Sequence, residues 1–189
     1  MDGQFKRLLL QALFSPSSAA LGRALQQLRI NTAPVSHFLP LLPPGLKDRA
    51  RLLDNTGNLT AHYEQLREQG WRWIALGDKD YPELLSKIAD PPGVLAVRGD
   101  VRVLSEPSLA IVGARNASAV GLRFARELAN GLGREDVVIV SGLARGIDGA
   151  AHAGALSSGT IAVLAGGIDH VYPPEHAALH AQIAERGLL

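Results

Sequence analysis

Apolar residues are spaced differently in the first third of this chain and in the rest. Within the first 60 residues they recur every three or four positions, as in Phe5–Leu13 and Ala20–Leu28, which is typical of amphipathic helices. Prolines between residues 34 and 44 interrupt this spacing. The sequence therefore predicts a small all-helical domain over residues 1–60. Its leucines form the core of that domain or, as an alternative, a surface for a partner.

Short elements of both kinds are predicted between residues 59 and 99. A helix over 59–69 ends at Gly70, because glycine commonly stops a helix. Strands are predicted at 71–75 and 94–99, and a short helix at 81–88 has proline near its start. We place this stretch in a second domain that covers residues 61–189.

Short apolar runs alternate with amphipathic stretches from residue 108 onward. Strands are predicted at 109–113, 137–140 and 160–164. The helices between and after them are a first one through 124–132 that closes at Gly131 or Gly133, a second at 147–156 and a third at 174–183. All-apolar strands that alternate with helices indicate an α/β fold, a Rossmann-like parallel sheet covered on both faces. Gly187–Leu189 has the pattern of the beginning of a further strand, so we expect the sheet to be incomplete at this end.

Three turns follow the predicted strands, and parallel sheets bind ligands at the carboxyl ends of their strands. The second turn leads into a helix with Asp148 in its first turn, a geometry that offers backbone N–H groups to phosphate. Arg115 and Arg145 occupy equivalent places after two strands, and guanidinium groups suit oxyanions in shaped pockets. The predicted phosphate- or DNA-binding residues are Gly113, Arg115, Asn116, Ser141, Gly142, Arg145, Gly146, Gly166 and Gly167.

The same turns lack the signatures of several enzyme classes. The first turn matches neither G-x-G-x-x-G nor G-x-x-x-x-G-K-[ST], and Ser141 is not within G-x-S-x-G. Asp148 and His152 lie on one helical face, and we interpret them as a structural pair rather than an acid–base pair. His176 and His180 have ligand-like spacing without an H-E-x-x-H pattern. We predict no catalytic residue, no metal and no cofactor.

Composition and charge restrict the classes of protein and of binding site that are compatible with this sequence. The net charge is only +1, and from Ser108 onward all cations are arginines, so any anion site is local. Because there is no cysteine, disulfides and thiolate-bound zinc are excluded. No apolar stretch approaches the length of a membrane span, and the first residues lack a cleavage site for secretion. We therefore expect a cytoplasmic protein without a membrane segment.

Several ordered motifs carry a resemblance to a known family. They are Asp80–Leu85, Asp90–Leu95, Val97–Asp100, Ile111–Arg115, Ser141–Asp148, Ala150–His152 and Ile168–Glu175. Over about residues 66–189 the chain resembles the DNA-processing protein A family (DprA, also called Smf), which acts in natural transformation.

The resemblance implies an extended Rossmann-like domain that binds single-stranded DNA without a nucleotide cofactor. It also implies a homodimer that protects incoming DNA and hands the strand to the recombinase RecA. In this family Arg115, Ser141, Gly142 and Arg145 would line the DNA pocket. Residues 1–60 take the place of the family's sterile-alpha-motif-like or helix-hairpin-helix-like domain, although Phe14–Ser18 replaces the glycine-rich hairpin. The family's later Arg-Asn-Arg-type segment is not in this sequence.

An alternative function is that of a nucleoside-monophosphate phosphoribohydrolase of a related Rossmann-like class. Those enzymes carry P-G-G-x-G-T-x-x-E, whose glutamate is catalytic. The nearest match here, Ala165–His170, lacks the proline, the threonine and the glutamate. We therefore expect a binding protein rather than an enzyme. Aromatic side chains are scarce, so stacking on bases would come from Tyr172 or from the family's later segment that is not in this sequence.

Overall fold

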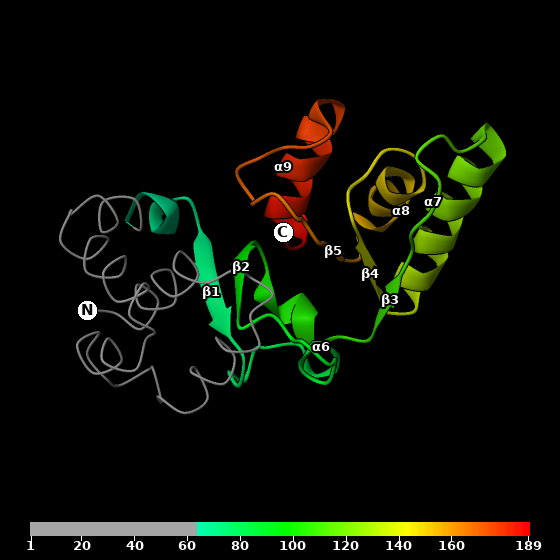
Figure 1. Cartoon of the computed structure of the whole chain (residues 1–189). Helices are drawn as coiled ribbons and strands as arrows, with labels where there is room; N and C mark the ends of the chain where they lie inside the picture. Colours follow the sequence, from blue (N-terminus) through cyan, green and yellow to red (C-terminus); the bar gives the residue numbers. More distant parts are fainter. Residues whose placement is uncertain (1–63) are drawn as a thin grey trace, which may run out of the picture. The chain divides into compact units, whose positions relative to one another are not determined.

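The computed structural model describes residues 64–189 (Figure 1). The chain divides into two compact units, Met1–Ala96 and Val97–Leu189, with the division inside strand β2. The helical domain predicted over residues 1–60 lies outside the described residues, and so does its predicted boundary with the second domain. Both stay predictions.

The described part of the first unit contains a two-stranded sheet. Its strands are β1 (Trp71–Ala75) and β2 (Val94–Arg98), close to the predicted ranges. Residues 64–68 are helical, and Gly70 with φ 83° turns the chain into β1, as the sequence predicts for this stop residue. Trp71 and Trp73 are buried, with ring centroids 6.4 Å apart.

The connection between these strands holds a single helical turn, α6 (Glu83–Ser86), where the sequence predicts a longer helix. It ends early because the Ser86 hydroxyl donates to the carbonyl of Glu83, and the N–H of Lys87 closes a tighter turn onto Leu84. Before it, the Tyr81 hydroxyl donates to the Pro92 carbonyl at 2.7 Å. Burial raises the pKa of Tyr81 to about 12. Two of the family-like motifs are thus joined to each other by a structural hydrogen bond.

The second unit is built on three parallel strands in the order β3 (Ser108–Ala110), β4 (Val138–Ser141) and β5 (Thr160–Ala162). The register pairs Leu109 with Ile139 and Ile139 with Thr160. These strands confirm the predicted α/β class and parallel sheet, although each strand is shifted or shortened by one to three residues relative to its predicted range.

The helices of this unit are α7 (Ala119–Arg134), α8 (Ile147–Ala155) and α9 (Ala177–Arg186), the last preceded by the short helix η3 (Pro174–His176). The prediction that α7 closes at Gly131 or Gly133 is wrong, because the helix runs through both. Gly133 serves packing instead of termination: a Cβ there would lie 1.9 Å from Ser158 Oγ. The glycine therefore allows the helix to approach the turn after α8.

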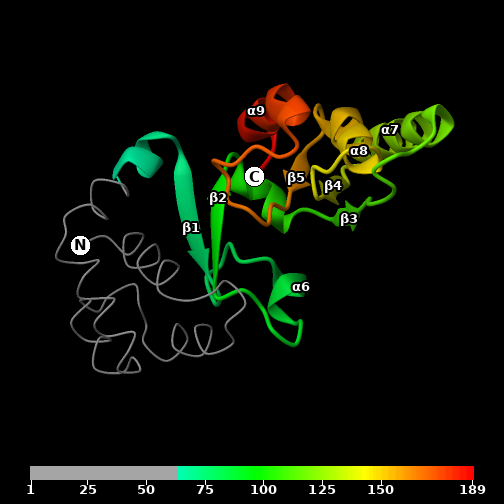
Figure 2. The same cartoon turned by 45° about the horizontal axis from the view of Figure 1, so that its top comes forward.

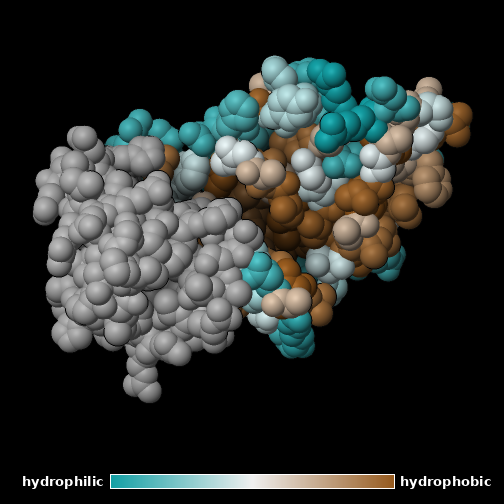
Figure 3. Space-filling view, in the orientation of Figure 1, coloured by the Kyte–Doolittle hydropathy of each residue, from teal (hydrophilic) through white to brown (hydrophobic). Residues whose placement is uncertain are grey.

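Coverage of the sheet also differs from the prediction. When parallel strands follow one another in sequential order through right-handed crossovers, the connecting helices lie on the same side of the sheet. Figures 1 and 2 show α7, α8 and α9 on one side of β3–β5. The expectation of helices on both faces is therefore wrong for the described residues. Directly beyond β3 and β5, Val112 and Val163 are 70% and 62% exposed. Figure 3 shows apolar side chains gathered over this part of the unit.

On the covered side, small residues allow close packing of helices on strands. The core cluster contains Ile111, Ile139, Ala129, Ala151 and Ala155, which come from the sheet, α7 and α8. Gly154 lies against the backbone of α7, where a Cβ would be 2.3 Å from the Arg126 carbonyl oxygen. This tight contact fixes α8, and with it the turn that precedes α8.

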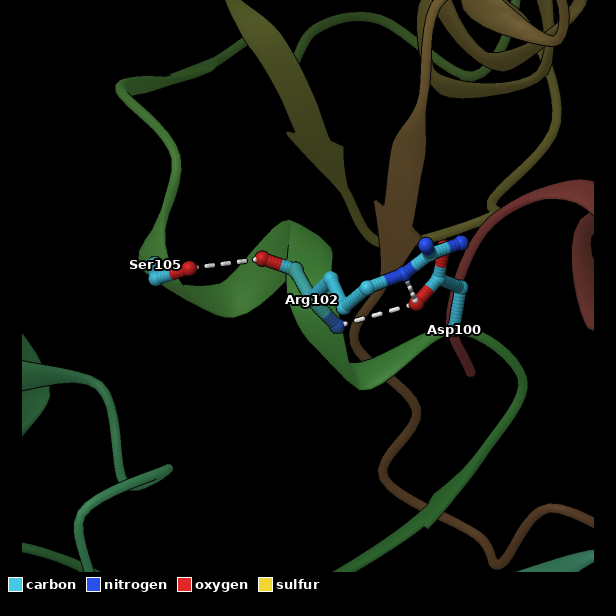
Figure 4. A network of polar contacts seen from close by, with 3 residues as sticks. All are labelled: Asp100, Arg102 and Ser105. Carbon is cyan, nitrogen blue, oxygen red and sulfur yellow. Dashed lines mark hydrogen bonds and ion pairs between the residues drawn. The ribbon is translucent and has the colours of Figure 1, made fainter.

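The last residues extend the sheet by isolated pairs. Leu188 forms a parallel bridge with Ile161 and an antiparallel bridge with Gly99, so it lies between these two segments. Gly99 has φ 123°, and a Cβ there would lie 2.3 Å from the Gly187 carbonyl oxygen. Asp100 then caps the short helix η2 (Val101–Ser105) and forms an ion pair with Arg102 at 2.7 Å (Figure 4). The Val97–Asp100 motif therefore pairs with the last residues and begins η2.

Candidate functional site

The turns after β3 and β4 are held together by one buried carboxylate. Asp148, in the first turn of α8, is 6% exposed. Its Oδ1 accepts from the N–H of Gly113 at 3.3 Å, and its Oδ2 accepts from those of Gly142 and Ala144 at 3.1 and 3.4 Å. Because Gly113 belongs to the first turn and the other two to the second, Asp148 joins the two turns.

A backbone contact reinforces this junction. Gly146 has φ 80°, and a Cβ there would lie 2.1 Å from the Ala114 carbonyl oxygen and 2.6 Å from that of Arg115. The next N–H, that of Ile147, donates to the Ala114 carbonyl at 3.2 Å. The two turns therefore touch through backbone, and a side chain at position 146 would separate them.

Several backbone N–H groups at these turns and at the start of α8 donate to acceptors within the protein. The N–H groups of Gly113, Gly142 and Ala144 donate to Asp148, and those of Gly149 and Ala150 donate to carbonyls of the same turn. Three of the first four N–H groups of α8, those of Ile147, Gly149 and Ala150, therefore donate to carbonyls of the turns. The arginine side chains are the cationic groups that these two turns offer to an anion.

Arg115 and Asn116 lie exposed in the first turn. Among residues 64–189, no carboxylate forms an ion pair with Arg115, so its guanidinium is available to a ligand. The turn ends at Ser118, whose hydroxyl accepts from the N–H of Gly121 and begins α7. The turn that carries Arg115 is thus fixed at both ends.

Arg145 is also exposed, but it has a partner. Its Nε donates to Oε1 of Glu175 in η3. This hydrogen bond, with the attraction of opposite charges, raises the pKa of Arg145 and lowers the pKa of Glu175. Glu175 lies within one of the family-like motifs, but the sequence predicts no role for it. An acidic residue beside a predicted turn does not indicate which cation it pairs with.

The histidines near η3 fix this segment. Nδ1 of His176 donates to the Leu143 carbonyl at 3.0 Å, and its ring lies on Gly149, where a Cβ would be 2.6 Å from Cε1. Nε2 of His180 donates to the Ile168 carbonyl at 2.9 Å. Within residues 64–189, no cluster of histidines and carboxylates has the arrangement of a metal site. The spacing of these histidines reflects anchoring of loops to α9 and to the second turn.

Two other polar residues lie below the turns. Ser141 is buried, and its hydroxyl donates to the Ile111 carbonyl at 2.6 Å. His152 is fully buried, with Nδ1 2.7 Å from the Thr160 hydroxyl, which itself donates to the Ile139 carbonyl. Because the Thr160 hydroxyl donates to Ile139, it accepts from Nδ1 of His152, which therefore carries the proton. Burial lowers the pKa of His152 to about 4, although the charge of Asp148 opposes this shift. These contacts fit a structural role for Asp148 and His152.

Gly166 and Gly167 form the exposed third turn, after β5, where Gly167 adopts φ 95°. Tyr172 follows it and is also exposed. The structure thus brings together the first two turns with Arg115, Arg145 and Glu175, and places the hydroxyl of Ser141 beneath them. No helix in residues 64–189 is both long and apolar enough to cross a membrane.

Comparison with known proteins shows the family to which this chain belongs. Residues 72–189 match the model of the family described as DNA recombination-mediator protein A. The chain belongs to this family. Among curated relatives of the DNA recombination-mediator protein A family, it is similar to the DNA processing protein DprA of Bacillus subtilis, with 43% identity over 126 residues. That alignment covers 65% of this chain and 42% of the relative, so the chain spans less than half of that protein's length.

Two solved structures of family members are similar as well. The DprA of Streptococcus pneumoniae matches with a TM-score of 0.74 and 28% identity, covering 100% of this chain and 67% of that one. The DprA of Helicobacter pylori, studied for its mode of binding single-stranded DNA, matches with a TM-score of 0.56 and 32% identity, covering 61% and 53%. These matches agree with the α/β fold and with the family resemblance found in the motifs.

Proposed function

We propose that this chain is the single-stranded DNA-binding part of a DNA-processing protein, with Arg115 and Arg145 as its phosphate ligands. The observation that carries the proposal is the pair of exposed guanidinium groups on two turns that Asp148 and Gly146 hold together. Family membership supports it, since the relative from Helicobacter pylori binds single-stranded DNA.

The chemistry of these groups defines how the strand would be held. Arginines on rigid turns contact phosphates through charge-assisted hydrogen bonds and do not read bases. Tyr172, exposed near the second turn, supplies a ring for stacking on a base. Asn116, Gly142, Gly166 and Gly167 lie exposed on the three turns and allow a close approach of the strand. Binding would be sensitive to salt and largely independent of sequence.

Binding of an oligo-dT by variants of the chain tests this proposal. Replacing both Arg115 and Arg145 by Ala should weaken binding at least tenfold, or about 1.4 kcal/mol. The slope of log affinity against log salt should fall by about 0.7 for each lost phosphate contact. Arg123→Ala combined with Arg126→Ala is the matched control, because both arginines lie exposed on α7 and the variant loses the same two charges. Unchanged affinity and slope in the double variant would refute the proposal.

We also propose that the site binds DNA without performing a reaction. The acidic groups nearest to the turns are engaged, Asp148 with backbone N–H groups and Glu175 with Arg145. Incubation with AMP should therefore release no adenine. Steady release would instead support the alternative, a phosphoribohydrolase.

Membership of the family is the basis for the wider role. We propose that the full-length protein is a cytoplasmic homodimer that protects incoming DNA during natural transformation and helps to load RecA. Light scattering tests the dimer, and RecA filament formation on DNA coated by a single-strand-binding protein tests the loading. A monomer, or filament formation at an unchanged rate, would contradict the respective part.

A further inference from the structure

The two arginines of the site occupy equivalent positions after their strands, but they differ in whether an acidic side chain pairs with them. Arg115 has no acidic partner within residues 64–189, whereas Arg145 is bound to Glu175. The side chains of this pair are 57% and 49% exposed, so water and ligands reach both. The charge presented by the second turn is therefore neutralised in the free protein.

Glu175 is held in this position by its neighbours. It lies in η3, where the adjacent His176 donates to the Leu143 carbonyl and packs on Gly149. Leu143 and Gly149 flank Arg145 on either side of the second turn. The segment that carries Glu175 is thus attached to the same turn as its partner, which keeps the backbones of Glu175 and Arg145 close together.

A carboxylate and a phosphate use the same guanidinium donors. A phosphate that binds Arg145 must consequently displace Glu175 or share the guanidinium with it. A single phosphate ion must displace Glu175 through its attraction to Arg145 alone. A DNA strand that is already held at Arg115 presents its next phosphates at a high effective concentration.

We infer that Glu175 is an internal competitor for the phosphate at Arg145, and that it makes the site selective for a strand over small anions. The inference rests on the proposed function, because it requires Arg145 to bind the DNA backbone. Displaced Glu175 remains close to the strand and repels it, which accelerates release.

Glu175→Gln tests this role, because it keeps the shape of the side chain and removes its charge. Since exposed ion pairs contribute up to about 1 kcal/mol, the variant should bind an oligo-dT about two- to fivefold more tightly. Inorganic phosphate should also displace the oligonucleotide from it at lower concentration. Glu185→Gln is the matched control, an exposed glutamate on α9 with the same change in net charge. Melting curves of all variants verify the fold.

The outcomes separate this inference from the proposed function. A gain that exceeds that of Glu185→Gln and shrinks when Arg145 is replaced by Ala supports the competitor role. An equal gain with and without Arg145, no gain, or weaker binding would overturn the inference. If replacing both Arg115 and Arg145 leaves oligo-dT binding unchanged, the proposed function itself fails, whatever Glu175→Gln does.

Discussion

The turn after β3 and the turn after β4 look alike in sequence, since each has a glycine close to an arginine after an apolar strand. Within residues 64–189, the guanidinium of the first turn has no acidic partner, whereas that of the second turn is paired with Glu175. Both turns depend on Asp148, and the difference arises from η3, which follows about 30 residues later in the chain. Equivalent positions in a repeated strand–turn–helix pattern therefore need not have equivalent charge.

The strongest way to break both turns at once is to remove their common acceptor. Asp148→Ala leaves the N–H groups of Gly113, Gly142 and Ala144 without a partner, and we expect a loss of about 4 kcal/mol in the free energy of unfolding. Urea titration measures this loss. Asp169→Ala, at an exposed carboxylate of the third turn, is the control and should change stability little. A similar stability of both variants would show that Asp148 does not organise the turns.

Acid should destabilise the layer beneath the turns. The pKa of His152 is about 4 in the folded protein and 6.5 in an unfolded chain, so protonation favours unfolding. Stability from this group is complete above pH 6.5 and declines as the pH falls toward 4, by about 3 kcal/mol in total. Urea titrations at several pH values measure the decline.

His152→Gln should remove this part of the pH dependence, whereas the exposed His170→Gln should keep it. The comparison is needed because the lowered pKa values of His180, Asp100 and Glu175 also make the protein less stable in acid. An identical pH profile for the wild type and His152→Gln would contradict the assignment to His152.

The contact between the turns can be broken without removing a charge. Gly146→Ala forces a Cβ toward the Ala114 carbonyl and a side chain into φ 80°, at a cost of about 2 kcal/mol. Gly131→Ala is the matched control, because no atom lies within 4 Å of its Cβ and alanine favours the helix α7. We expect a lower melting temperature for the first variant and an equal or higher one for the second. Equal melting temperatures would show that the turns tolerate separation.

Local patterns predicted the elements that form this site but not how they meet. The apolar runs and Gly146 located β4 and the beginning of α8 correctly, because strand and helix periodicity are properties of neighbouring residues. The one-sided position of the helices depends on strand order, which no local pattern contains. Likewise, Asp148 binds Gly113 across 35 residues and Arg145 binds Glu175 across 30. These partners become neighbours only when the strands lie side by side.

The smallest expected effect is the difference in DNA affinity between variants of Arg115 and Arg145, and it compares the two arginines directly. Arg145→Ala alone would leave Glu175 unpaired and repelling the strand, so the informative variant removes both members of the pair. Arg145→Ala with Glu175→Gln leaves the net charge unchanged and should weaken oligo-dT binding only about threefold, whereas Arg115→Ala should weaken it about tenfold, a difference of well under 1.4 kcal/mol. Fluorescence anisotropy at two salt concentrations measures both. The salt dependence should fall more in Arg115→Ala, because that variant removes the uncompensated cation. If the paired variant loses as much affinity and as much salt dependence as Arg115→Ala, the two turns act equally on the strand, and the pairing with Glu175 has no effect on binding.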